Sequence, residues 1–292
     1  MKDKCISKYT YLKDIRVLSF DDEKVLIKRK KKYDIEKIYK YLDDHNVNSY
    51  LRPFKVTEEE LYFNYLDKRN LDNDEVAKHL VYALSDLQNK TTVYKEVDKD
   101  KLKEEYDEFN RKINYLEEYY FTLQDLVENK VYMAPSEYLF IRNVSIIYSA
   151  LNYAKSLVES WYKIMRKKTR ERYVYAHGKC ELNHFIAATN DYFISLEKAH
   201  LAKPAEDFIH FFKSNCMDTD MISNFRLYQH RYHYKEEEYL YLLINITIPL
   251  KIDIYPSSLD KCVELGVFFD KLKLTSEFVL KNEKDKKQYE KH

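Results

Sequence analysis

The side chains with the most chemical potential gather in three short segments of this 292-residue chain. Lys28 ends the apolar segment Val25-Leu26-Ile27-Lys28, and a lysine ammonium can neutralise a phosphate. The run His177-Gly178-Lys179-Cys180-Glu181-Leu182-Asn183-His184 and, further on, Glu197 carry imidazole, amine and carboxylate groups. His184 and Glu197 could together bind an ion softer than Mg²⁺, but two ligands are too few to define a metal site.

Each of these residues also has a structural interpretation. Lys28 begins the basic run Lys28-Arg29-Lys30-Lys31-Lys32, and lysines on an edge strand prevent unwanted strand pairing. Glu36 has Lys40 four residues later for a surface ion pair. His177 is expected to shape its loop rather than transfer a proton. Lys179 could contact a nucleotide phosphate, point to solvent or pair with Glu181.

Scarcity of glycine excludes several enzyme classes. The chain has two glycines, Gly178 and Gly266, where an average chain of this length has about 20. Phosphate-binding loops of the Rossmann and Walker A types need several glycines for close backbone approach, and the nucleophile elbow G-x-S-x-G is also absent. Ordinary Rossmann enzymes, P-loop NTPases and α/β-hydrolases are therefore excluded.

Composition indicates a reduced, cytoplasmic globular protein. The four cysteines are isolated, so a zinc ribbon or a redox dithiol is not expected. No signal peptide is visible at the N-terminus, and the longest apolar run, Tyr239 to Leu250, is too short to cross a membrane. The net charge is +1, with apolar residues at 45% and charged residues at 34%, so a core can form and no general attraction to nucleic acid arises.

The elements that must position these groups change along the chain from strands to helices. Asp14 to Phe20 and Lys24 to Lys30 form a predicted hairpin, Asp34 caps a helix over Ile35 to Leu42, and two extended runs follow at Tyr50 to Val56 and Glu60 to Leu66. From Asn73 onward the period is helical. We predict helices near 73–87, over Asp98 to Glu128 with a break near Leu123, and over about 30 residues from Ser136. The last of these buries a stripe composed of Phe140, Val144, Ile147, Leu151, Ala154, Val158, Trp161 and Met165.

Short strands interrupt the helical part. They are predicted at Tyr173 to Ala176, Phe185 to Ala187 and Tyr192 to Leu196. Helices then follow over Pro204 to Lys213, Met221 to Arg231, Glu236 to Ile246 and Leu259 to Leu272. The tyrosines Tyr106, Tyr115, Tyr119 and Tyr120 are expected to pack between helices.

This order of elements, with specific residues, resembles the protein-kinase-like fold in the branch of the aminoglycoside and choline phosphotransferases, closest to bacterial spore-coat kinase-like proteins. Val25 to Lys28 looks like the strand with the phosphate-binding lysine, and Glu36 is placed like its ion-pair partner. The loop from His177 to His184 lies where the family has H-G-D-x-H-x-x-N, and Phe193 to Glu197 where it has its metal-binding strand. Further similar segments are Tyr62 to Asp67 (the hinge), Leu80 to Lys90, Lys203 to Phe208 and Ile248 to Lys251.

The departures from the family pattern concern its chemistry. The catalytic aspartate falls on Lys179, an already protonated group that cannot accept a proton. The metal-binding asparagine falls on His184 and the principal metal aspartate on Ser195. Glu197 remains, and if it shares a strand with Ser195 both point to one face, so one carboxylate could still reach a metal. The scaffold residues His177, Gly178, Pro204 and Asp207 are retained.

The resemblance implies an α+β, bilobal fold with a strand-rich N-lobe over 1–66, a helical C-lobe over 67–292 and a hinge near 64–68. The loss of the chemical residues favours a pseudokinase, not an enzyme, that binds a partner or small ligand between its lobes. ATP is the implied cofactor, with or without a divalent metal, bound by Lys28, Glu36 and Glu197, with Glu197 the candidate metal ligand. No catalytic residue is assigned in the degenerate loop of His177, Lys179 and His184.

Two alternatives stay open. One is an atypical ATP-dependent small-molecule phosphotransferase in which Glu197 holds the metal and Glu181 or Asp191 acts as the base. The other is a helical nucleic-acid-binding module, suggested by the basic clusters at Lys28–Lys32 and Lys167–Arg172 together with the many tyrosines. We expect nucleic acid not to be the partner, because the second cluster has the position of a cationic helix C-terminus.

Overall fold

A computed structural model describes residues 8–12, 15–20, 23–29 and 35–289. Contacts divide the chain into two compact units. Unit 1 combines residues 1–92 with 174–202, and unit 2 combines 93–173 with 203–292. The predicted lobe boundary near residues 64–68 stays a prediction, since these units group the chain by contacts and not by the family's lobes.

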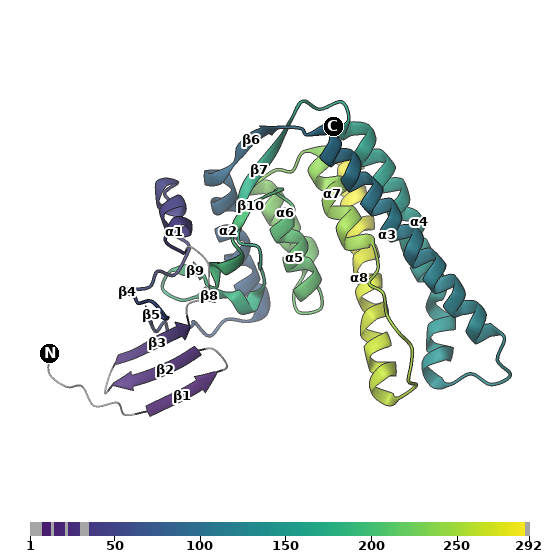
Figure 1. Ribbon diagram of the computed structural model, residues 1–292, viewed down its shortest axis with the longest axis horizontal. Helices are drawn as coiled ribbons and strands as arrows, with labels where there is room; N and C mark the ends of the chain where they lie inside the picture. The colour runs from purple at the N-terminus through teal and green to yellow at the C-terminus, as the bar shows by residue number, and fades with distance from the viewer. Residues whose placement is uncertain (1–7, 13–14, 21–22, 30–34, 290–292) are drawn as a thin grey trace. The chain divides into compact units, whose positions relative to one another are not determined.

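Unit 1 contains an antiparallel five-stranded sheet in the order β1-β2-β3-β5-β4 (Figure 1). The strands are β1 (Lys8–Leu12), β2 (Ile15–Phe20), β3 (Glu23–Arg29), β4 (Lys55–Val56) and β5 (Glu60–Asn64). The predicted hairpin is confirmed, with Phe20 opposite Glu23, whereas its turn residues and the proposed cap Asp34 lie outside the described residues. Strand β1 was not predicted.

Two helices and a small hairpin complete unit 1. Helix α1 (Ile35–Asp44) buries Ile35, Ile38 and Leu42 on the predicted face. Helix α2 (Asn73–Thr91) begins with a capping box in which the side chain of Asp72 accepts from the backbone N–H of Glu75. Strands β8 (Phe185–Ala187) and β9 (Asp191–Phe193) pair as a hairpin, and β9 hydrogen-bonds the backbone at Ser49 and Leu51.

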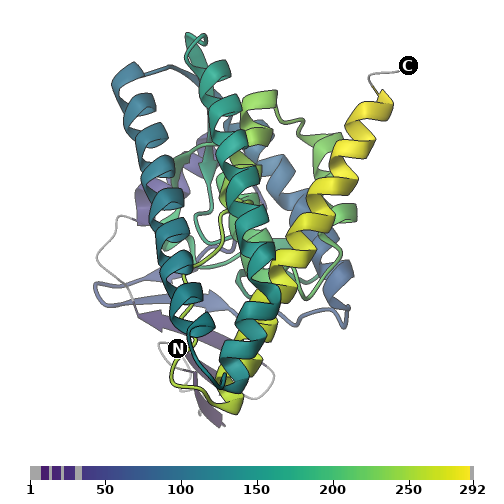
Figure 2. The same ribbon diagram turned by 90° about the vertical axis from the view of Figure 1, so that its right-hand side faces the viewer.

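Long helices form the core of unit 2. Helix α3 (Lys99–Glu128) is continuous, so the predicted break near Leu123 is wrong: Leu123 is buried and no helix breaker stands there. Helix α4 (Pro135–Met165) buries all eight residues of the predicted stripe. Four further helices are α5 (Glu206–Asn215), α6 (Met221–Arg231), α7 (Glu236–Thr247) and α8 (Leu259–Tyr289). Figure 2 shows α8 beginning beside α4 and diverging from it toward the C-terminus.

Of the tyrosines predicted to pack between helices, Tyr119 and Tyr120 contact the segment between α7 and α8, whereas Tyr115 is 52% exposed. Tyr120 is buried, and its hydroxyl donates to the carbonyl of Leu250 and accepts from the N–H of Ile252. The hydroxyl of Tyr119 donates to the carbonyl of Ile252 at 3.0 Å. These bonds fasten the irregular segment between α7 and α8, so the tyrosines have a structural role.

Strand β7 (Arg170–Ala176) runs from unit 2 into unit 1. Its first half pairs with β6 (Val93–Glu96), where Val93 lies opposite Tyr173, and its second half with β10 (His200–Ala202), where Ala202 lies opposite Val174. Neither β6 nor β10 was predicted. The described residues include no helix long and apolar enough to cross a membrane.

Candidate functional site

The candidate site lies in unit 1 around Lys28, the penultimate residue of β3. The Lys28 ammonium forms an ion pair with the carboxylate of Glu197 and donates to the hydroxyl of Ser195 at 3.1 Å. Each side chain of the ion pair is 15% exposed. Two of the three predicted binding residues, Lys28 and Glu197, are thus in direct contact although 169 positions separate them.

The third predicted binding residue, Glu36, is elsewhere. It lies in the first turn of α1 and its side chain is exposed. The carboxylate that Lys28 contacts is therefore that of Glu197. A role for Glu36 toward a nucleotide stays a prediction, and its position is equally suited to a solvated surface carboxylate.

Ser195 and Glu197 do not share a strand, which corrects the expectation about their side chains. Strand β9 ends at Phe193, Ser195 is left-handed with φ of 65° and ψ of 52°, and Glu197 lies in the short 3₁₀ helix η2 (Leu196–Lys198). For a residue other than glycine this conformation costs about 1 kcal/mol or more. This turn, and not the alternation of side chains along a strand, brings the Ser195 and Glu197 side chains to Lys28.

An apolar cavity of about 60 Å³ lies beside this ion pair. It is far smaller than the roughly 300–1,000 Å³ of typical ligand pockets. Because its walls exclude water from one side of the pair, they strengthen the attraction between Lys28 and Glu197. Besides Lys28, Ser195 and Glu197 the lining residues are Leu26, Ile35, Tyr39, Leu51, Leu61, Phe63, Ile186, Ile194 and Leu196.

The loop that follows β7 is held by His177 and Gly178. His177 is buried, and its Nε2 lies 2.8 Å from the carbonyl of Ile194, so this nitrogen carries the proton and donates it. Gly178 has a φ of 72°, and a Cβ atom built on it would lie 2.2 Å from the carbonyl oxygen of Lys198. These contacts are those of a residue that shapes its loop, and the structural role of His177 stays a prediction.

His184 lies in the 3₁₀ helix η1 (Leu182–His184) and pairs with Glu181. The Nε2 of His184 is 2.9 Å from Oε1 of Glu181. Burial and, next, the charge of Lys179 lower the pKa of His184, with a smaller contribution from Lys28. Its Nδ1 is buried and makes no hydrogen bond within the described part of the chain. Lys179, in the position of the family's catalytic aspartate, is half-buried.

Asp191, the other acid considered as a base, belongs to a separate cluster. Its carboxylate accepts from a guanidinium nitrogen of Arg69 at 3.0 Å and lies 2.8 Å from Nδ1 of His79. These partners come from the segment before α2 and from α2 itself. Nothing in the sequence pointed to Arg69 or His79, because no local pattern joins residues so far apart in the chain.

A divalent metal does not fit the residues present. Mg²⁺ prefers several hard oxygen ligands in octahedral geometry. The residues predicted to stand at the family's metal positions are a neutral hydroxyl at Ser195, an imidazole at His184 and one carboxylate at Glu197 that already neutralises Lys28. Within the described ranges no cluster of at least three His, Cys, Asp or Glu could hold a metal ion. Lys28 supplies one cation of the kind that a phosphate contacts, and its role toward a nucleotide stays a prediction.

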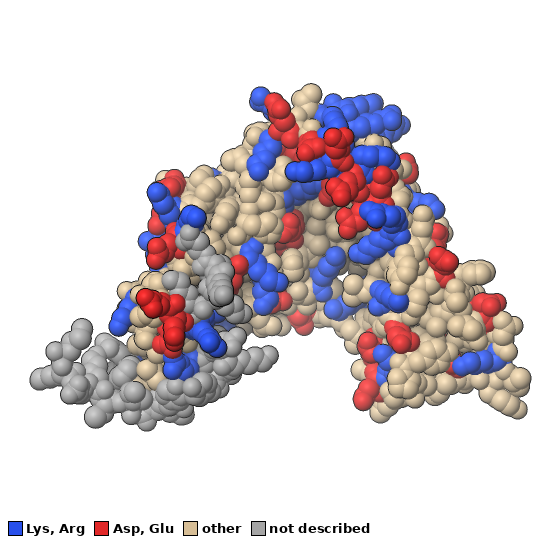
Figure 3. Space-filling model, in the orientation of Figure 1, with Lys and Arg blue, Asp and Glu red and all other residues tan. Residues whose placement is uncertain are grey.

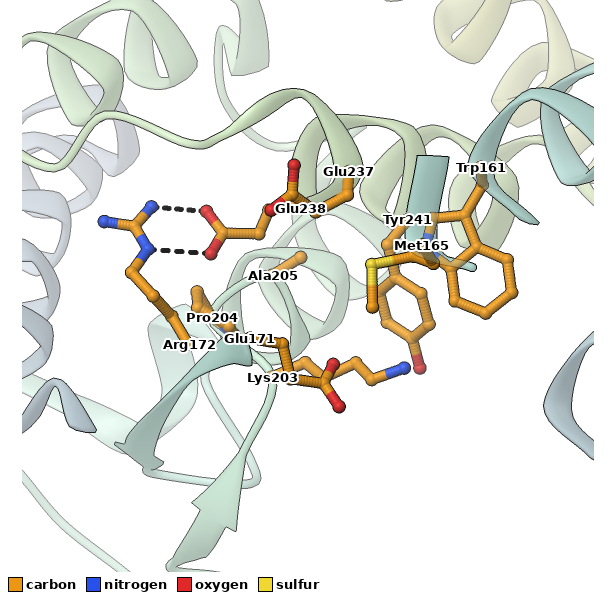
Figure 4. Close-up of a pocket in the computed structure, with 10 residues that line it drawn as sticks. All are labelled: Trp161, Met165, Glu171, Arg172, Lys203, Pro204, Ala205, Glu237, Glu238 and Tyr241. Carbon is orange, nitrogen blue, oxygen red and sulfur yellow. Dashed lines mark hydrogen bonds and ion pairs between the residues drawn. The ribbon is translucent and has the colours of Figure 1, made fainter. Parts of the chain in front are cut away.

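A second pocket, in unit 2, is closed by the protein's own side chains (Figure 4). Its volume is only about 20 Å³. Arg172 and Glu238 form a bidentate pair on one side of it, with 2.7 Å between Arg172 Nε and Glu238 Oε1. On the other side the Lys203 ammonium lies over the rings of Trp161 and Tyr241, and it is paired with Glu105. These contacts indicate a structural network.

The basic cluster Lys167–Arg172, which follows α4, is partly neutralised. Arg172 is paired with Glu238, and Lys168 lies 3.0 Å from Glu237. On the face drawn in Figure 3, the lysines and arginines near β6 and β7 are interspersed with acidic side chains. This arrangement lacks the continuous basic stripe of a nucleic-acid-binding surface.

Comparison of the whole structure with solved structures gives the fold. An aminoglycoside phosphotransferase from Alicyclobacillus acidocaldarius matches with a TM-score of 0.67 and 12% identity, over 96% of this chain and 94% of the other. The fold is that of the aminoglycoside phosphotransferases. An AMP-bound spectinomycin phosphotransferase matches with a TM-score of 0.57 and 13% identity, over 92% of this chain and 93% of that chain.

The same spectinomycin enzyme, in complex with ADP and spectinomycin, matches with a TM-score of 0.53 and 12% identity, over 93% of this chain and 92% of that one. No protein-family model and no curated protein matches the sequence. The predicted α+β fold, with a small strand-rich N-terminal region and a mainly helical C-terminal region, is confirmed. The finer likeness to spore-coat kinase-like proteins stays a prediction.

The environment of His184 predicts a pH dependence of stability. Its folded-state pKa lies below its unfolded value of about 6.5, so the unfolded chain binds more protons at acidic pH. We expect the free energy of unfolding to decrease as the pH falls through about 6.5, and to decrease less in His184→Asn. Urea unfolding between about pH 7.5 and 5.5 measures this. The matched control His233→Asn, at an exposed histidine, should follow the wild type; identical profiles for all three proteins would contradict the assignment.

Proposed function

We propose that this chain is a pseudokinase: it binds a nucleotide through Lys28 and does not transfer the phosphoryl group. One observation supports this most directly. The carboxylates around the candidate site already have cationic or imidazole partners within unit 1, because Glu197 pairs with Lys28, Glu181 with His184, and Asp191 with Arg69 and His79. The position of the family's catalytic base carries Lys179. The biological output would then come from binding a protein or small ligand.

The chemistry that remains is recognition of an anion. A phosphate that approaches Lys28 competes with Glu197 for the ammonium, so binding exchanges one ion pair for another. If the Glu197 carboxylate keeps part of its contact with Lys28, its negative charge stays neutralised. No metal ion is then needed beside it. Nucleotide binding should therefore be modest in affinity and independent of divalent metal.

A thermal-shift titration with ATP tests the proposal. We expect ATP to raise the melting temperature equally with and without Mg²⁺ or Mn²⁺, by a stabilisation of about 2.7 kcal/mol at 100 times the dissociation constant. Lys28→Ala should abolish the shift. Lys24→Ala, at an exposed lysine on the same strand, is the matched control and should retain it.

A second function, an atypical phosphotransferase, is favoured by the pairing of Glu181 with His184. Nδ1 of this imidazole is buried, so the Glu181 carboxylate, which lies 2.9 Å from Nε2 of His184 and is partly exposed, is the candidate base in this function. This function predicts metal-dependent ATP turnover that is lost in both Glu197→Gln and Glu181→Gln. Such turnover would overturn the pseudokinase proposal, and so would the absence of any shift at millimolar ATP.

A further inference from the structure

Two hydrogen-bond donors of the candidate site lie close enough to contact one anion. The Lys28 ammonium donates to the hydroxyl of Ser195 at 3.1 Å. Because Oγ of Ser195 accepts this bond, the hydrogen of the hydroxyl stays available, and it meets no acceptor in the part of the chain that the structure describes. The ammonium and the hydroxyl can therefore both donate to oxygens of a single phosphate group.

The charges around these two donors add up to about zero. Of the described residues that line the adjoining cavity, Lys28 and Glu197 are the charged ones, and they neutralise each other. Further out, the Lys179 ammonium is close enough to influence His184, and the Glu181 carboxylate beside His184 has the opposite sign. Each phosphate after the first therefore brings negative charge that no surplus cation at the site offsets.

A triphosphate needs more positive charge than this site offers. Kinase sites for triphosphates combine a lysine with Mg²⁺ and with a glycine-rich loop that covers the phosphates. Here the carboxylate of Glu197 is paired with Lys28, and the described ranges contain no cluster of three or more metal-binding side chains. The two glycines of the chain, Gly178 and Gly266, are far apart, so the chain has no glycine-rich loop.

We propose that the candidate site prefers a nucleoside monophosphate to nucleoside di- and triphosphates. Lys28 and Ser195 donate to the single phosphate, and the Glu197 carboxylate repels a second one. This preference rests on the nucleotide binding proposed above and narrows its ligand. A monophosphate lacks the phosphoanhydride bond of a phosphoryl donor, so the preference agrees with a protein that binds a nucleotide and transfers no phosphoryl group.

Thermal-shift titrations of the full chain with adenosine, AMP, ADP and ATP, all without divalent metal, test the preference. We expect AMP to have the lowest dissociation constant, about tenfold or more below that of ATP, and adenosine to bind more weakly than AMP. ATP binding more tightly than AMP would overturn the preference and leave the pseudokinase proposal intact. Adenosine binding as tightly as AMP would also overturn it. If none of the four compounds binds, the proposed nucleotide binding itself fails.

Two variants separate the donor from the repelling carboxylate. Ser195→Ala should raise the dissociation constant of AMP about fivefold and leave that of adenosine unchanged, because only the phosphate loses a donor. Glu197→Gln should lower the dissociation constant of ATP more than that of AMP, because the removed charge repels the triphosphate more. Glu58→Gln, at an exposed carboxylate of unit 1, is the matched control and should keep the wild-type ratio of the two constants. A ratio unchanged in Glu197→Gln would overturn the role of that carboxylate.

Discussion

Replacement of Gly178 with alanine is expected to destabilise the protein by about 3 kcal/mol or more. Gly178 has a φ of 72°, and its added Cβ would lie 2.2 Å from the backbone oxygen of Lys198. The obstacle is backbone and cannot rotate away, so η2 must move, and with it Glu197. Urea unfolding measures the loss, and the nucleotide-induced thermal shift should decrease as well.

The other glycine provides a matched control. Gly266→Ala introduces the same methyl group in open space inside a helix, where alanine is favoured by about 0.5–1 kcal/mol. We expect this variant to be more stable than the wild type, as measured by urea unfolding. Equal effects of the two substitutions would show that the conformation of the loop around Gly178 differs from the one described.

Removal of the Arg172 guanidinium is the second change with a large expected effect. Arg172 and Glu238 are 13% and 8% exposed, and Arg172 also donates to the carbonyl of His233 at 2.8 Å. Arg172→Met would leave the Glu238 carboxylate buried without its cation, which costs about 3–5 kcal/mol. Urea unfolding at neutral pH measures the loss.

A double-variant cycle separates the ion pair from packing. Arg172→Met with Glu238→Gln should recover part of the stability, because the uncompensated charge is then removed. Lys103→Ala breaks an exposed pair with Asp107 and should leave stability unchanged within error. If Arg172→Met behaved like Lys103→Ala, the network beside the unit 2 pocket would not be a source of stability.

Much of the fold could be predicted because local patterns determine it. The stripe of α4 follows helical periodicity over about eight turns, so tertiary contacts only confirm what the sequence indicates. The strands β1, β6 and β10 could not be predicted in this way, because their pairing with β2 and β7 depends on tertiary contacts. The break assigned near Leu123 failed because charged and tyrosine-rich sequence is compatible with a continuous helix.

The candidate site was predicted only in part. The positions of Lys28 and Glu197 follow from the order of motifs, but their direct contact depends on the left-handed turn at Ser195. A serine is not a residue for which positive φ is expected, so no sequence signal marked that turn. Arg69 and His79, the partners of Asp191, were missed because residues that pair across long stretches of chain form no periodic pattern in a single sequence.

The discontinuity of unit 1 has a consequence for the order in which the protein folds. Its segments 1–92 and 174–202 are separated by the whole α3–α4 helical hairpin, and the Lys28–Glu197 contact spans 169 residues. During synthesis the sheet of unit 1 emerges long before the segment with Ser195 and Glu197, so Lys28 is made long before its partners. The local helical contacts of α3 and α4 can form meanwhile, and their pairing shortens the effective loop that must close. The residues of the candidate site are therefore all present only after the α3–α4 hairpin has been synthesised.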